Sequence, residues 1–218
     1  MYDLCIFDLD GTLSDPKVGI TKSYQHALAA FGIYEDADDL AKFIGPPLRE
    51  NFREYYSLSD SDTEKAVTIF REYFAEKGLI ENIIYPEIPD ILQKLKDCGK
   101  TLAVATTKVK LFTDTVLIYL DIGKYFKFVA GDEMDGSLTK NGKRDIIRNV
   151  LDALDPERKM KAVMIGDRKY DILGARDNGI DSIGALWGYG SRSELEEAGA
   201  TWIAGSVEDI WRLAASGL

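Results

Sequence analysis

Hydrophobic positions along the chain follow two alternating patterns. Short apolar runs predict strands at 3–7, 101–105, 126–130, 162–165, 182–186 and 201–204. Between them, apolar residues recur every three or four positions, which predicts helices at 87–98, 109–120, 143–154, 171–178 and 207–215. Strands that alternate with helices form a parallel sheet with both faces covered. The chain is therefore predicted to have an α/β fold with a three-layer parallel sheet core.

A long segment after the first strand has only helical periodicity. It predicts a helix at 17–31, two short helical pieces around 45–48 and an amphipathic helix at 60–77, for which Ser61 or Asp62 is the expected cap. Because the strand at 3–7 belongs to the sheet, this segment is an insertion. We predict a catalytic core of residues 1–14 and 86–218 and a helical cap domain of residues 15–85.

Composition and charge narrow the partners. The 218 residues carry 27 Lys and Arg against 37 Asp and Glu, a formal charge of −10. This balance disfavours nucleic acid and anionic membranes. We expect a small-molecule partner, no membrane association, and a monomer or weak homodimer. Two cysteines, with no signal peptide or membrane-spanning run in this sequence, predict a cytoplasmic location.

Carboxylates end the first predicted strand. Asp8 and Asp10 follow the apolar run directly, and unpaired carboxylates beside a core are costly unless a cation or hydrogen bonds balance them. Other polar residues follow later strands or open a helix, so they converge at the same edge of a parallel sheet: Thr106, Thr107, Lys143, Asp167 and Asp171. Oxygen ligands without a His or Cys cluster favour Mg²⁺.

Several assignments in this set have close rivals. Thr107 competes with Thr106 for the hydroxyl position, and Lys140 and Arg144 compete with Lys143 for the cation position. Asp171 either ligates the metal, directly or through water, or only holds its loop through backbone N–H groups.

The motifs, taken together, resemble those of the haloacid dehalogenase superfamily, and most closely its phosphoglycolate phosphatase-like branch. The resemblance rests on the run from Asp8 to Leu13, then Thr106, Lys143 and the run from Gly166 to Asp171, with further support from Trp187 to Gly190. It implies a Rossmann-like core with an inserted cap.

This resemblance also implies roles for the residues. Asp8 is the expected nucleophile and Asp10 the expected acid and base. Phosphate is expected to bind at Gly11, Thr106 or Thr107, and Lys143. Asp8, Asp167, Asp171 and the carbonyl of Asp10 are the expected Mg²⁺ ligands.

The expected activity is Mg²⁺-dependent hydrolysis of a small phosphomonoester through a phospho-aspartate intermediate. The substrate expected first among the candidates is 2-phosphoglycolate. A nucleoside monophosphate 5′-nucleotidase and a sugar-phosphate mutase are the alternatives, and a non-enzymatic binding protein is a third. Substrate choice is expected to lie with Asp15, Gly45, Pro46 and Arg49, since Arg49 can meet a substrate carboxylate through two hydrogen bonds.

Overall fold

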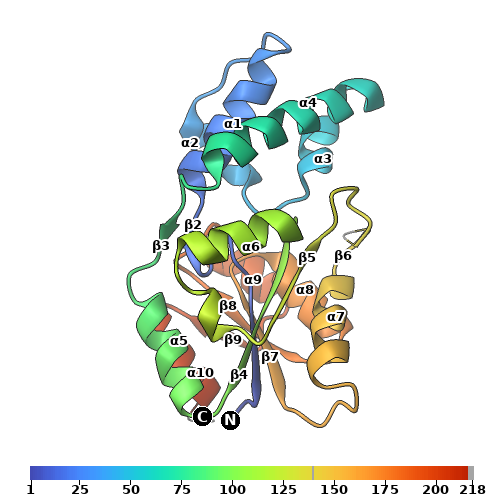
Figure 1. Cartoon of the computed structure of the whole chain (residues 1–218). Coiled ribbons are helices and arrows are strands. Elements are labelled where there is room, and N and C mark those ends of the chain that lie inside the picture. Colours follow the sequence, from blue (N-terminus) through green and yellow to red (C-terminus); the bar gives the residue numbers. More distant parts are fainter. Residues whose placement is uncertain (139, 216–218) are drawn as a thin grey trace. The chain divides into compact units, whose positions relative to one another are not determined.

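A six-stranded parallel sheet forms the centre of the larger of two units (Figure 1). The structure is a computed structural model and describes residues 1–138 and 140–215. The strand order is β5-β4-β1-β7-β8-β9. These strands are β1 (Leu4–Phe7), β4 (Thr101–Val109), β5 (Phe128–Asp132), β7 (Ala162–Gly166), β8 (Asp181–Ala185) and β9 (Trp202–Ala204).

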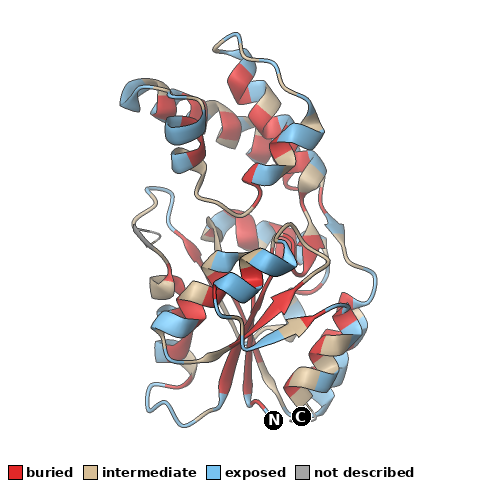
Figure 2. Cartoon of the chain, turned by 180° about the vertical axis from the view of Figure 1, so that it is seen from behind, coloured by how far each residue is buried: buried red, intermediate tan, exposed pale blue. Residues whose placement is uncertain are grey.

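Helices cover both faces of this sheet. Leu4 and Ile6 of β1 pack with helix α7 (Arg144–Leu154) and helix α8 (Lys169–Asp177). Helices α5 (Ile88–Asp97) and α6 (Lys110–Tyr119) contact β4, and helix α10 (Val207–Ala215) contacts α5 and β9. In Figure 2 the central strands are largely buried, whereas the helices keep exposed outer faces. The predicted three-layer α/β fold is confirmed.

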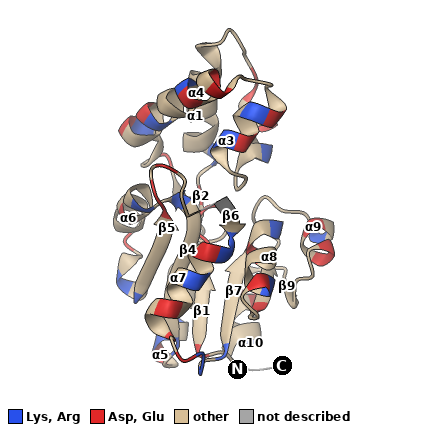
Figure 3. Cartoon of the chain, turned by 90° about the vertical axis from the view of Figure 1, so that its right-hand side faces the viewer, with Lys and Arg blue, Asp and Glu red and all other residues tan. Residues whose placement is uncertain are grey.

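The smaller unit, residues 16–83, is helical. It contains α1 (Lys17–Ala29), α2 (Ala37–Leu40), η1 (Ala41–Phe43), α3 (Leu48–Glu50), η2 (Asn51–Tyr55), α4 (Asp60–Tyr73) and η3 (Phe74–Gly78). Aromatic rings meet within its core, where the buried Tyr24 ring lies 5.0–5.4 Å from the rings of Phe43, Phe52 and Phe70. Figure 3 shows acidic and basic residues interspersed on α4 and α7, so neither helix carries charge of a single sign.

The chain divides into residues 1–15 with 84–218, here called the core unit, and residues 16–83, here called the helical unit. Strands β2 (Ser14–Asp15) and β3 (Ile83–Ile84) pair with each other, and each lies where the chain leaves one unit for the other. The sequence placed a cap domain at 15–85, and that functional assignment stays a prediction. No helix among the described residues is long and apolar enough to cross a membrane.

Several element boundaries differ from the sequence-based prediction. Strand β4 runs through Thr106 and Thr107 to Val109, with a register shift against β5, although its apolar run stops at Ala105. Helix α4 is capped by Ser59, which accepts the amide of Asp62, rather than by Ser61 or Asp62. Strand β6 (Lys140–Lys143) and helix α9 (Arg192–Glu197) were not predicted, because neither carries an apolar repeat.

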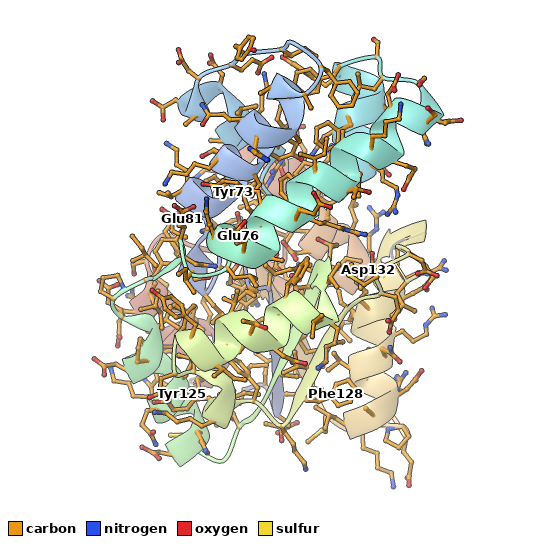
Figure 4. The ribbon with its side chains drawn as sticks, turned by 45° about the horizontal axis from the view of Figure 1, so that its top comes forward. Tyr73, Glu76, Glu81, Tyr125, Phe128 and Asp132 are labelled. Atoms are coloured by element: carbon orange, nitrogen blue, oxygen red, sulfur yellow. The ribbon has the colours of Figure 1, made fainter. Side chains whose placement is uncertain are left out.

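Strand β5 also lies two residues later than predicted. It covers Phe128–Asp132, and Figure 4 shows these two residues at its opposite ends. Asp132 stops the strand because its Oδ1 accepts the amides of Glu133 and Leu138, 2.8 and 3.1 Å away, which folds the following loop. Residue 139 of the loop predicted at 136–142 lies outside the described residues.

Candidate active site

Asp8 and Asp10 begin a tight turn at the carboxyl end of β1. The Asp8 amide still donates to Ile165 of β7, 2.9 Å away, and the amides of Leu13 and Ser14 then fold back onto the Leu9 carbonyl. Gly11 has a φ of +84°, which a residue with a side chain rarely adopts. The Gly11 amide donates to Ser14 O at 2.8 Å, and the phosphate contact expected at Gly11 stays a prediction.

Three buried carboxylates meet beside this turn. Each of Asp8, Asp167 and Asp171 offers an oxygen atom, and these atoms all lie within 4.8 Å of one another. Burial raises the pKa of Asp167 to about 8, with added repulsion from Asp171 and Asp8. Burial likewise raises the pKa of Asp171 to about 6. Such a cluster is unfavourable until positive charge is placed among its oxygens.

Lys143 supplies one positive charge from the end of β6. Its Nζ lies 2.8 Å from Asp8 Oδ1 and also pairs with Asp171 Oδ1. Burial lowers the pKa of Lys143, but Asp171 and Asp8 outweigh this effect and the net pKa is raised, so the ammonium form is retained. The structure thus brings Lys143 to the cluster as predicted, although it precedes α7 rather than opening it.

The backbone packs closely against two carboxylates of the cluster. A Cβ added to Gly11 would lie 2.3 Å from Asp167 Oδ2, and one added to Gly166 would lie 2.1 Å from the Asp171 carboxyl carbon. Thr12 Oγ1 donates to Asp167 Oδ1 at 3.1 Å, which orients that carboxylate. Glycines hold the backbone close to three mutually repelling oxygen donors, so the residues present fit a hard divalent ion such as Mg²⁺.

Asp171 also has the second role considered for it. Its Oδ2 accepts the amide of Arg168 at 3.0 Å, which closes the turn into α8. The carboxylate therefore stabilises its own loop and faces the cluster at the same time.

Asp10 pairs with a lysine that the sequence-based site did not include. Lys108 Nζ lies 2.5 Å from Asp10 Oδ2, and both side chains are largely buried. Burial raises the pKa of Asp10, and Lys108 opposes this shift. The signal for Lys108 was present in the run Thr106-Thr107-Lys108, but a lysine past the apolar part of a strand resembles an ordinary surface residue.

The two threonines of β4 differ in burial. Thr106 is 2% exposed, and its Oγ1 accepts the amide of Lys108 at 3.3 Å, whereas Thr107 is half-buried. A hydroxyl that accepts in this way keeps its proton for another acceptor. This arrangement favours Thr106 over Thr107 as the phosphate contact.

The residues predicted to choose the substrate are not brought together within one unit. Asp15 belongs to the core unit, where its Oδ1 accepts the hydroxyl of Tyr189. Gly45 and Pro46 lie in the helical unit between η1 and α3. Arg49 forms a two-bond pair with Glu64 of α4, at 2.7 and 3.1 Å, so its guanidinium already binds a carboxylate of this chain.

The chain is similar to a known protein family and to several named proteins. Residues 5–185 match the haloacid dehalogenase-like hydrolase family. A 5′-nucleotidase of Pseudomonas aeruginosa is 42% identical over 197 residues, which cover 89% of this chain and 87% of that protein. The tyrosine-protein kinase PtkA of Mycobacterium tuberculosis is 35% identical, covering 95% and 70% of the two chains. A phosphoglycolate phosphatase of Aquifex aeolicus is 32% identical, covering 84% of each.

Solved structures agree with these sequence matches. A crystal structure of a predicted phosphatase from Clostridium acetobutylicum superposes with a TM-score of 0.91 and 41% identity, covering 98% of each chain.

Proposed function

The chain belongs to the haloacid dehalogenase-like hydrolases, and on this basis we propose that it is a Mg²⁺-dependent phosphomonoester hydrolase with Asp8 as its nucleophile. The observation that carries the proposal is the buried cluster of Asp8, Asp167 and Asp171, with Lys143 against two of its members. Three carboxylates held this close are more stable with a divalent cation among them than without one. The bound cation then offsets the repulsion between the carboxylates and a phosphate dianion.

Asp8 is suited to attack phosphorus. Its Oδ1 accepts the Leu9 amide at 2.7 Å and Lys143 at 2.8 Å, so the carboxylate is fixed in orientation. In the first step the Asp8 carboxylate forms a bond to phosphorus while the bond to the leaving oxygen breaks. In the second, water attacks the phosphorus of phospho-Asp8, which releases phosphate and restores the carboxylate.

Asp10 is the proposed carrier of the protons in both steps. It gives a proton to the leaving oxygen and then takes one from water. An incoming phosphate dianion competes with Asp10 for the Lys108 ammonium. Asp10 is then left buried beside Asp8, which favours its protonated form.

The cation would be held by Asp8, Asp167, Asp171 and the Asp10 carbonyl. When bound, Mg²⁺ neutralises the repulsion between carboxylates and phosphate and polarises the phosphoryl group. Thr106 and Lys143 would hold the remaining phosphate oxygens.

Nucleoside 5′-monophosphates head the proposed substrates, ahead of 2-phosphoglycolate. The similarity to a 5′-nucleotidase, at 42% identity, exceeds that to the phosphoglycolate phosphatase, at 32%. In addition, Arg49, the residue considered for a substrate carboxylate, is already paired with Glu64.

A substrate panel tests this proposal. Free phosphate is measured from 5′-UMP, 2-phosphoglycolate and p-nitrophenyl phosphate, each with Mg²⁺ and with EDTA. We expect Mg²⁺-dependent release, fastest from the nucleotide. Release that persists in EDTA would contradict the metal assignment. Conversion of a sugar phosphate to its isomer without net phosphate release would favour a mutase instead.

A further inference from the structure

The loop between β8 and α9, residues 186–190, contacts two separate parts of the site. The Trp187 indole N–H donates to the carbonyl of Thr12 at 3.1 Å. The Tyr189 amide donates to Asp167 Oδ2 at 2.8 Å, and its hydroxyl donates to Asp15 Oδ1. One residue therefore binds Asp167 through its backbone and Asp15 through its side chain.

The backbone of this loop has no free space next to Asp167. A Cβ added to Gly188 would lie 2.4 Å from Asp167 Oδ2 and from the Gly11 carbonyl, and one added to Gly190 would lie 1.9 Å from the Asp167 carbonyl. Such distances do not occur between real side chains and their neighbours. The loop consequently fixes where the Asp167 carboxylate lies.

Asp15 is the last residue of the core unit before the chain enters the helical unit. The returning chain is tied to the same segment, because the Tyr85 amide donates to Leu13 O at 3.3 Å. Trp187 and Tyr189 hold this segment at Thr12 and Asp15, on either side of Leu13. The outgoing connection to the helical unit is thus anchored at its core end by the 186–190 loop, and the returning connection is tied to this anchored segment through Leu13.

We propose that Tyr189 is a positioning residue with two separable roles. Its hydroxyl fixes the core end of the chain segments that lead to the helical unit, and its amide, with Gly188, fixes Asp167. Only the second role rests on the proposed function, in which Asp167 is a Mg²⁺ ligand.

Two variants separate the roles. Tyr189→Phe removes the hydroxyl and keeps the ring and the amide. We expect hydrogen exchange of the Tyr85 amide to become about tenfold faster, while the Mg²⁺ dissociation constant from calorimetry changes by less than about twofold. Gly188→Ala displaces Asp167 instead, and should weaken Mg²⁺ binding by about 10- to 100-fold, with little change in exchange at Tyr85.

Turnover gives a further distinction between the variants. Excess Mg²⁺ should restore the hydrolysis rate of Gly188→Ala but not that of Tyr189→Phe, in which kcat and KM change together. A purely structural defect would be restored by Mg²⁺ in neither variant.

Matched controls are available in the core unit. Tyr119→Phe changes an exposed tyrosine of α6, and Gly123→Ala adds a Cβ whose nearest neighbour lies 3.7 Å away. Both should retain wild-type exchange and Mg²⁺ affinity. If Gly188→Ala does not fold, Asp15→Asn serves as the second variant. Combined with Tyr189→Phe it should be no more severe than Asp15→Asn alone, because both changes weaken the same hydrogen bond.

Wild-type exchange at Tyr85 in Tyr189→Phe would overturn the proposal, as would additive effects in the double variant. A Mg²⁺ affinity of Tyr189→Phe reduced as much as that of Gly188→Ala would also overturn the proposal. Exchange requires no turnover, so it tests the anchoring role even if the wild-type chain hydrolyses no phosphoester. A wild-type chain without Mg²⁺ binding would contradict the proposed function and leave the exchange result interpretable.

Discussion

Under the proposed function, single residues at the ends of β1 and β7 determine the chemistry of the core unit. Asp167 is fully buried, and both its oxygens accept hydrogen bonds, from Thr12 Oγ1 and from the Tyr189 amide. These two hydrogen bonds orient the Asp167 carboxylate but do not neutralise its charge. The buried charge therefore has to be balanced by a proton or a cation. Replacing this one side chain therefore separates folding from metal binding.

Asp167→Asn should lose the response to Mg²⁺ without losing stability. Above pH 8, where Asp167 with its pKa of about 8 is ionised without metal, the amide removes a buried charge that repels Asp8 and Asp171, so the metal-free variant should melt no lower than the wild type. Mg²⁺ at about 100 times its dissociation constant stabilises a folded protein by about 2.7 kcal/mol, and only the wild type should show the corresponding rise in melting temperature. Asp177→Asn, an exposed site on α8, is the control and should respond like the wild type. An equal Mg²⁺ shift in Asp167→Asn would contradict its role as a ligand.

The two cysteines should differ strongly in reactivity. Cys5 lies inside β1, and burial raises its pKa to about 12, whereas Cys98 is exposed. Since the thiolate is the reactive form, iodoacetamide at pH 8 should modify one thiol of the folded chain and two after unfolding in guanidinium. Intact mass spectrometry gives the count, and Cys98→Ser should leave no rapidly modified thiol. Rapid modification of Cys5 in the folded state would contradict the burial of β1.

At the scale of elements, close backbone packing holds the helical unit together. Helix α1 meets η3 at two glycines, and a Cβ on Gly19 would lie 2.3 Å from the carbonyl of Gly78. Aromatic residues pack around Tyr24 of the same helix. The two segments are about 60 residues apart in sequence, so hydrophobic periodicity alone does not reveal this contact.

Gly19→Ala should destabilise the helical unit despite the higher helix propensity of alanine. Overpacking at a tight contact costs about 1–3 kcal/mol, which exceeds the gain of about 1 kcal/mol from replacing glycine in a helix. Val18→Ala changes an exposed neighbour on the same helix and should stay within about 0.5 kcal/mol of wild type. Urea unfolding measures both. Equal stability of Gly19→Ala and wild type would contradict the close packing of α1 and η3.

The elements also show what the sequence could and could not predict. Regular apolar repeats predicted α5 and α7 and every strand of the large sheet, because burial on one face or both leaves a clear pattern. Strand β4 was predicted too short, since three polar residues, Thr106 to Lys108, interrupt its apolar run before the strand ends at Val109. Helix α9 was missed because it buries a single leucine, Leu195.

For the molecule as a whole, the order of strands brings the candidate site together. Strands β4, β1 and β7 are neighbours in the sheet, so the residues that follow β1 and β7 meet those near the end of β4. The sequence could predict that Asp8 and Asp167 lie close together at this edge of the sheet, because each follows the apolar run of a strand. It could not predict the pairing of Lys108 with Asp10 or of Tyr189 with Asp15, because these depend on side-chain directions across elements far apart in sequence.

The central claim is that the phosphoryl group of the substrate is bound covalently to Asp8 before water releases it as phosphate. The most direct measurement is an acid quench during turnover with Mg²⁺, followed by peptide mass spectrometry, beside the rates of Asp8→Asn and the surface control Asp97→Asn. We expect one added phosphoryl group on the peptide that contains Asp8, a rate lower by about 10³-fold or more in Asp8→Asn, and a wild-type rate in Asp97→Asn. A phosphoryl group on another residue, or near-normal phosphate release by Asp8→Asn, would contradict the account.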